Sequence, residues 1–238
     1  MSYYFIIGVN IIMSRARLFF KGLKNYKFPD DFDDILTYLF FSKINEFRES
    51  NDEFKDFEYY TFSDFVIENY HENKNSFVCI DGIVSVVISS INNVFLKEFI
   101  GFLLTEDTLQ FGHNELRLYK FVFLDDVKFK SESDFITCTP ICLENFKGKL
   151  NLFSSLEKNL MKDYRKYHNL TKCRLYCEIK TNGDQFQKYV DLNPKTEYDD
   201  HYYILDLHIS GDNELISFAY DCGLGNKKYQ GFGMLDLY

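Results

Sequence analysis

The sequence has no tryptophan, only 3 prolines and no hydrophobic run long enough to cross a membrane. The lack of such a run excludes a membrane-spanning helix, and we expect no membrane partner. The apolar stretch "YYFIIGVNII" near the start has no basic leader and no small-residue cleavage site, so we interpret it as a strand and not as a signal peptide. Scarce proline beside 26 phenylalanines and 18 tyrosines indicates an AT-rich coding sequence, so part of the aromatic excess carries no functional information.

Positive charge is also scarce, because 27 basic and 36 acidic side chains give a net charge of −9. This balance is unfavourable for a nucleic-acid binder, whose affinity depends largely on cations that neutralise phosphates. The acidity is concentrated in the first part of the chain: residues 1–150 carry 16 basic and 23 acidic groups, and residues 151–238 carry 11 and 13. Any polyanion should therefore bind to the second half.

The six cysteines do not form a recognisable zinc motif. Two pairs, Cys138 with Cys142 and Cys173 with Cys177, have i,i+4 spacing, but both pairs fall in strand-like runs and not in tight loops. Buried free thiols explain them better, and free thiols favour a reducing setting. We therefore expect an intracellular, cytoplasmic location and no metal or other cofactor.

Apolar periodicity and turn signals predict two successive β-α-β-β-α-β units. In the first unit we expect strands at residues 15–23, 57–65, 76–80 and 84–90, helices at about 32–48 and 93–104, and a hairpin or strand at 109–124. In the second we expect a strand at 134–144, a helix at 153–168, a hairpin formed by 173–180 and 187–192, a strand at 201–210, a helix at 213–223 and a last strand at 231–238. The predicted fold is α+β, with two tandem ferredoxin-like (RRM-like) domains, residues 1–124 and 125–238.

The stretch "GLGNKKYQGFG" holds two G-x-G pairs between a predicted helix and a predicted strand. This order excludes a P-loop and a dinucleotide fingerprint, which place their glycines after a strand and before a helix. Gly223 falls where a left-handed C-cap residue is expected. Successive N–H groups can bind an anion, and lysines can add charge at the rim, although a purely structural turn is the alternative. The predicted phosphate-binding residues are Gly223, Gly225, Asn226, Lys227, Lys228, Gly231 and Gly233.

The predicted helix 153–168 is a second candidate for phosphate binding. Its residues Lys158, Lys162, Arg165 and Lys166 form a basic stripe opposite an apolar face, and Arg174 extends this stripe. A solvated helix face is the alternative interpretation.

Together, these motifs resemble the guide-RNA-processing endoribonucleases of CRISPR systems, the sixth Cas family. The resemblance rests on the pattern Gly223-Leu224-Gly225 and Gly231-Phe232-Gly233 at the end of a double ferredoxin-like chain. In addition, "TPICLE" is similar to the family's Ser-Pro-Ile strand, "LEKNLMKDYRKYH" to its Asn-Leu-x-x-Lys-Tyr helix, and "FEYYTFSDF" to its Phe-Thr-Phe-Ser strand. Residues 1–14 resemble an extension before the family's usual start.

The resemblance implies that the partner is CRISPR repeat or guide RNA, and not DNA. It also implies a metal-independent cleavage, in which a 2′-hydroxyl attacks the adjacent phosphate and leaves a 2′,3′-cyclic phosphate and a 5′-hydroxyl. That chemistry needs a base, an acid and a cation. Many members carry a histidine in the window that corresponds to residues 45–60, which contain none here. The expected replacements are Tyr38, Lys43 and Lys55 by position and His71 by exposure, with plain packing or solvation as the alternative for each.

The missing histidine and the acidic first half leave two other functions open. One is a catalytically silent subunit of a CRISPR effector complex. The other is an anti-CRISPR inhibitor that binds or cuts the guide RNA of a host.

Overall fold

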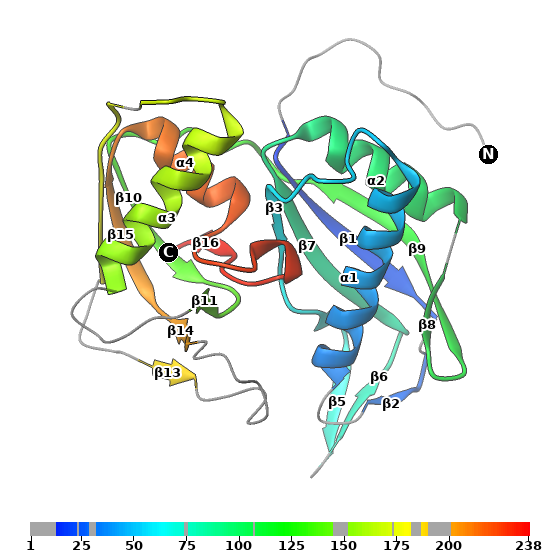
Figure 1. Ribbon diagram of the computed structural model, residues 1–238. Coiled ribbons are helices and arrows are strands. Elements are labelled where there is room, and N and C mark those ends of the chain that lie inside the picture. Colours follow the sequence, from blue (N-terminus) through cyan, green and yellow to red (C-terminus); the bar gives the residue numbers. More distant parts are fainter. Residues whose placement is uncertain are drawn as a thin grey trace.

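The computed structural model describes residues 13–22, 24–28, 32–73, 76–106, 108–144, 152–172, 174–181, 187–189 and 201–238. The strand expected near the start of the chain lies outside these residues and stays a prediction. The described chain forms two units that lie side by side, each with a sheet and a pair of helices (Figure 1).

The first unit is an antiparallel sheet with two helices packed against it. In order across the sheet, its strands are β3 (Tyr60–Phe62), β7 (Ile83–Ser90), β1 (Arg15–Lys21), β9 (Asn114–Phe123) and β8 (Thr108–Phe111), and β4 (Val66–Ile67) also pairs with β7. The helices are α1 (Phe32–Ser50) and α2 (Asn93–Glu106). A separate small sheet has the order β2 (Lys27–Phe28), β6 (Ser76–Cys79) and β5 (Tyr70–Asn73).

The hydrophobic patterns of this unit explain how its elements pack. Along β1, Leu18 and Phe20 are buried, whereas Arg17 and Lys21 are exposed, because successive side chains point to opposite faces of a sheet. The buried positions of α1 recur every three or four residues, at Phe32, Leu36, Phe40, Ile44 and Phe47. Helix and sheet thus enclose one aromatic core.

The second unit repeats the arrangement. Its main sheet has the order β12 (Cys177–Thr181), β15 (Asp206–Gly211), β10 (Glu132–Thr137) and β16 (Leu235–Leu237). The helices are α3 (Leu152–Tyr167) and α4 (Asn213–Cys222), followed by the short 3-10 helix η2 (Lys228–Gln230). A smaller sheet has the order β11 (Ile141–Leu143), β14 (His201–Ile204) and β13 (Gln187–Tyr189).

The structure confirms the predicted α+β class and the tandem ferredoxin-like arrangement. Three strand predictions were wrong in detail. The run 134–144 forms two strands in different sheets, β10 and β11, with Pro140, which has no N–H to donate, between them. The run 201–210 is likewise divided between β14 and β15. The predicted hairpin does not form, because β12 pairs with β15 and β13 pairs with β14.

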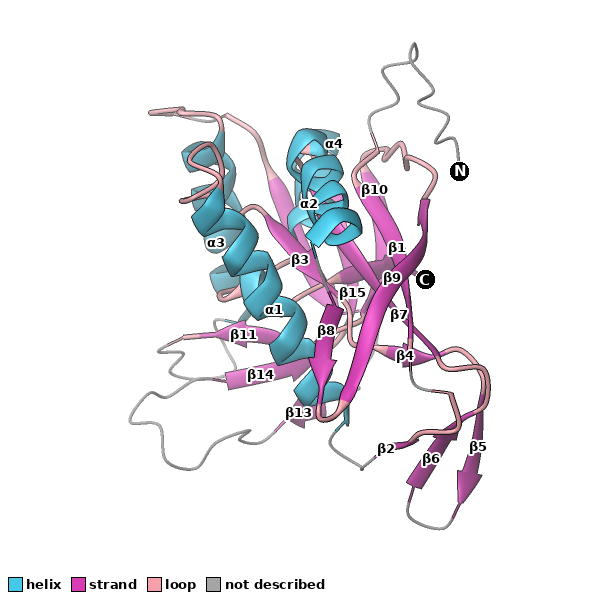
Figure 2. Ribbon diagram, turned by 90° about the vertical axis from the view of Figure 1, so that its right-hand side faces the viewer, coloured by secondary structure: helices cyan, strands magenta, loops and turns pink. Residues whose placement is uncertain are grey.

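The helical side of the molecule and the open side of the first sheet point in opposite directions. In Figure 2, α1 and α3 lie on the left, whereas β1 and β9 lie on the right. Among the described residues, no helix combines the length and the apolar character needed to cross a membrane.

Arg15, at the start of β1, joins the two units. Its side chain is buried, and Nη2 donates hydrogen bonds to the carbonyl oxygens of Leu235 (2.7 Å) and Tyr220 (2.5 Å). The guanidinium carbon lies 3.3 Å from the ring centroid of Tyr220, and Nη1 lies 3.7 Å from a carboxylate oxygen of Asp236. A residue of the first sheet therefore fixes the end of α4 and the strand β16.

Candidate nucleic-acid interface

The glycine loop, residues Gly223–Gly233, is folded tightly on itself. The N–H of Leu224 donates to the carbonyl oxygen of Gly233 (2.9 Å), and the N–H of Gly233 donates to that of Pro140 (2.9 Å). A Cβ on Gly233 would lie 1.9 Å from the carbonyl oxygen of Leu224, so no larger residue fits there. Gly223 ends α4 as expected, but with φ 79° and ψ 177° instead of the left-handed helical conformation that we predicted.

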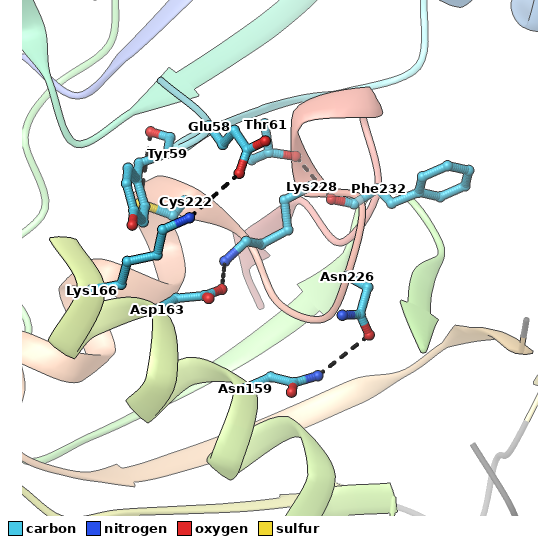
Figure 3. A network of polar contacts seen from close by, with 10 residues as sticks. All are labelled: Glu58, Tyr59, Thr61, Asn159, Asp163, Lys166, Cys222, Asn226, Lys228 and Phe232. Carbon is cyan, nitrogen blue, oxygen red and sulfur yellow. Dashed lines mark hydrogen bonds and ion pairs between the residues drawn. The ribbon is translucent and has the colours of Figure 1, made fainter. Parts of the chain in front are cut away.

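The loop joins elements of both units (Figure 3). The hydroxyl of Thr61 on β3 donates to the carbonyl oxygen of Phe232 (3.0 Å), and a Cβ on Gly231 would lie 2.7 Å from the ring of Phe62. Toward the second unit, the side-chain oxygen of Asn226 accepts a hydrogen bond from Asn159 of α3 (3.4 Å). All four glycines are buried, and close packing accounts for them: Gly231 lies against the first unit, whereas Gly225 and Gly233 lie against backbone of the second unit and of the loop itself.

The two lysines of the loop do not both lie at its rim, as we had expected. Lys228 is buried, and its ammonium group bonds to the carboxylate of Asp163 on α3 (Figure 3). Lys227 is partly exposed, and its ammonium nitrogen lies 3.7 Å from a carboxylate oxygen of Glu144. Lys228 therefore holds the loop against α3, and Lys227 alone is open to solvent.

The basic stripe of α3 lies on the surface, as predicted. Lys158, Lys162, Arg165 and Lys166 are exposed, opposite the buried side chains Leu152, Leu156, Leu160 and Tyr164. Lys166 reaches the first unit, where its ammonium nitrogen lies 3.8 Å from a carboxylate oxygen of Glu58. Within the described part of the chain, the other three cations form no ion pair. They are therefore available to an anionic ligand.

A groove of about 520 Å³, which we call the α3 groove, runs beside this stripe. Its lining is formed by Glu157, Lys158, Met161, Lys162, Arg165, Leu175, Tyr176 and Cys177. Tyr176 is 61% exposed, and its backbone is fixed because its N–H donates to the carboxylate of Asp212 (2.6 Å). Arg174 lies exposed on the same segment. The groove thus combines several cations with an aromatic ring on which a base could stack.

Our interpretation of the sequence missed Tyr176. The sequence predicts one strand over residues 173–180, in which Arg174 and Tyr176 alternate with the cysteines. In the structure the strand begins only at Cys177, and Leu175 and Tyr176 before it line the groove. An aromatic residue two positions after an arginine was the signal available in the sequence.

The four predicted catalytic residues are not brought together. Tyr38 is 68% exposed on α1, and Lys43 pairs with Glu46 at 2.8 Å. Lys55 is exposed in the turn after α1. His71 was predicted to lie in a turn, but it lies on β5. This strand belongs to the small sheet whose strand β2 precedes α1 (Figure 1). Because a helix of this length spans about 28 Å, Lys55 at one end and His71 near the other cannot contact the same phosphate.

Phe41 of α1 packs beside the glycine loop, where its ring centroid lies 6.3 Å from that of Tyr229 in η2. Tyr38 precedes Phe41 by three residues, about one helical turn, and is exposed. Nearby, burial raises the pKa of the Tyr59 phenol to about 12, so this tyrosine keeps its proton at neutral pH and cannot serve as a base.

Comparison with known proteins shows a similarity to one family. The family described as CRISPR associated protein Cas6, C-terminal, matches residues 124–237. CRISPR-associated endoribonuclease Cas6 1 of Methanocaldococcus jannaschii is 28% identical over 195 residues, which are 76% of this chain and 74% of the relative.

Solved structures show the same likeness. A structure described as CRISPR associated protein Cas6 has a TM-score of 0.79 and 25% identity, and the match covers 94% of this chain and 99% of that one. A second, described as an RAMP protein binding different RNA substrates, has a TM-score of 0.74 at 17% identity with the same coverage, and shows the fold alone. The resemblance inferred from the glycine pattern is thereby confirmed.

Proposed function

We propose, on the ground of its similarity to Cas6 proteins, that the chain binds CRISPR repeat RNA and cuts it as an endoribonuclease. The observation that carries the RNA-binding part is the α3 groove with its three cations, Lys158, Lys162 and Arg165. These three cations are exposed and line one groove, and cations are the groups that phosphates require.

The groove supports a specific mode of RNA binding. Lys158, Lys162 and Arg165 would neutralise successive phosphates along α3, and Tyr176 would stack on one base. Arg174 and Lys166 would extend the contact at either end. Lys227 would add charge beside the glycine loop, whereas Lys228 and the glycines would act by keeping the loop in place.

The proposed reaction uses the RNA's own nucleophile. The 2′-oxygen forms a bond to phosphorus, the bond from phosphorus to the 5′-oxygen breaks, and the products are a 2′,3′-cyclic phosphate and a 5′-hydroxyl. The 2′-hydroxyl loses a proton, and the 5′-oxygen gains one, so no metal-bound water is needed. Tyr38 is the candidate that orients the phosphate or donates the proton, and Lys43, five residues further along α1, is the candidate cation for the phosphorane.

RNA binding is tested by neutralising the groove. The groove is neutralised by a triple variant, Lys158→Gln, Lys162→Gln, Arg165→Gln. This variant should bind labelled repeat RNA more weakly. Its slope of log affinity against log salt should be smaller by about 0.7 for each phosphate that is no longer neutralised. Lys97→Gln, Lys128→Gln, Lys130→Gln removes the same charge from exposed lysines that do not line the groove. Equal slopes for the two triple variants would contradict the assignment.

Cleavage is tested with the same RNA in EDTA. We expect defined products with cyclic-phosphate ends, and a rate at least about tenfold lower for Tyr38→Phe, since a positioned acid or base contributes more than that. Tyr70→Phe, at an exposed tyrosine of β5, is the matched control. RNA binding without any cut would contradict the endoribonuclease and favour a silent subunit.

A further inference from the structure

The open face of the first sheet carries two aromatic rings that belong to no core. Alternation along β1 places Arg17, Phe19 and Lys21 on the face opposite the buried Leu18 and Phe20. Phe19 is partly exposed, and Tyr119 of β9 is 48% exposed. This face is directed away from the helices (Figure 2).

A β-bulge gathers these side chains. The register of β1 against β9 shifts between Phe19 and Phe20: Phe20 lies opposite Leu118, but Phe19 lies opposite Lys120. The extra residue is Tyr119, and a bulge of this kind re-aims a side chain. Tyr119 and Lys120 consequently both lie beside Phe19.

The geometry of the group is that of a small aromatic platform with cations around it. The rings of Phe19 and Tyr119 meet edge to face, with centroids 6.4 Å apart and an interplanar angle of 68°. The ammonium nitrogen of Lys120 lies 5.1 Å from the centroid of the Phe19 ring, and that of Lys21 lies 5.9 Å from the centroid of the Tyr119 ring. We call Arg17, Phe19, Lys21, Tyr119 and Lys120 the sheet patch.

The charge of the sheet patch is positive, although the chain as a whole is acidic. Arg17, Lys21 and Lys120 are all exposed, as is Arg117 at the edge of the patch. Glu115 is the acid that faces this edge, where its carboxylate pairs with Arg117 at 3.0 Å. Three cations around two rings suit a ligand that offers phosphates and flat bases together.

We propose that the sheet patch binds an unpaired segment of RNA, with bases stacked on Phe19 and Tyr119 and phosphates near Arg17, Lys21 and Lys120. The inference rests on the proposed function and adds a second RNA surface to it. RRM domains, which share the β-α-β-β-α-β order of this unit, bind single strands through exposed aromatic residues on neighbouring strands of their sheet. Because β1 and β9 lie on the opposite side of the molecule from α3 (Figure 2), the sheet patch and the α3 groove would hold different segments of one RNA.

The test uses a labelled oligouridylate that is too short to form a stem. Phe19→Leu with Tyr119→Leu should weaken its binding about tenfold and leave the salt dependence unchanged, because stacking is not ionic. Lys21→Gln with Lys120→Gln should instead lower the salt slope. Tyr70→Leu removes a similarly exposed ring on β5 and is the control. Thermal melts of each variant establish that it is folded.

The inference is overturned if the double leucine variant binds oligouridylate as tightly as Tyr70→Leu does. It is also overturned if the unmodified protein does not bind oligouridylate. A third contrary outcome is that the unmodified protein is a dimer, and that the double leucine variant is a monomer with unchanged affinity for RNA. If the patch variants fail to bind oligouridylate while the unmodified protein fails to cut repeat RNA, the patch stands and the proposed endoribonuclease fails. If repeat RNA is cut and the patch variants bind oligouridylate normally, the endoribonuclease stands and the patch fails.

Discussion

Lys228 shows how burial changes the role of a charged residue. From the sequence, this lysine and its neighbour Lys227 look equivalent, since both stand between two glycine pairs. In the structure, one is buried against Asp163, and the other is partly exposed beside Glu144. The partner of Lys228 lies 65 residues away along the chain, so no local pattern could have predicted the pair.

Replacement of the two lysines should separate stability from RNA binding. We expect Lys228→Met to lower the free energy of unfolding by about 1–3 kcal/mol, because it leaves the carboxylate of Asp163 without its ion-pair partner in a largely buried position. Lys227→Met should cost less than about 1 kcal/mol, since its ion pair is more exposed. Urea unfolding measures both, and equal decreases would contradict the distinction.

Asp33, in the first turn of α1, should make stability depend on pH. Burial, followed by the charges of Asp64 and Asp34, raises its pKa from 3.8 to about 7. The folded state then binds more protons than the unfolded state between about pH 4 and pH 7, so stability falls as pH rises through this window. Asp33→Asn should remove the part of that decline that Asp33 causes and raise the Tm above pH 7, with little effect at pH 4. Asp64 and Asp221, whose pKa values burial raises to about 6, should keep the remaining part. Asp56→Asn, in an exposed turn, is the control, and an equal gain there would contradict the argument.

At the scale of elements, the helices and the long strands were predictable and their partners were not. The periodic apolar positions of α1, α3 and α4 and the alternation in β1 define these elements from sequence alone. The runs 134–144 and 201–210 read as single strands because nothing local marks where a strand passes from one sheet to another. The basic stripe was predictable because it follows the helical period of α3. The groove beside it was not, because it depends on the position of Leu175 and Tyr176 just before β12 begins at Cys177.

The glycine loop is an element whose function is to pack closely. Gly233→Ala should destabilise the protein by at least about 2 kcal/mol, because the new Cβ would lie 1.9 Å from a backbone carbonyl oxygen and φ is +69°. Gly101→Ala in α2 is the matched control: no atom lies within 4 Å of its Cβ, and alanine should stabilise the helix by about 0.5–1 kcal/mol. Thermal unfolding of the two variants should therefore shift in opposite directions.

At the scale of the molecule, the contacts of Arg15 join the two ferredoxin-like units, and the stability of the protein should depend on them. Arg15→Met would leave the carbonyl oxygens of Tyr220 and Leu235 without their donor, so we expect stability to fall by about 2–4 kcal/mol. Proteolysis in the segment 124–130, which connects the units without regular structure, should accelerate as well. Arg17→Met, at an exposed position of the same strand, should change neither property, and comparable effects in both variants would contradict the role given to Arg15.

The contacts of Arg15 also constrain the order of folding. Its two carbonyl partners lie 205 and 220 residues away along the chain, so nearly the whole described sequence separates the groups that meet. Contacts of such separation are entropically costly to close before the intervening chain is compact, which slows their formation. We therefore expect each unit to acquire most of its own structure first, and the junction that Arg15 forms with α4 and β16 to form late.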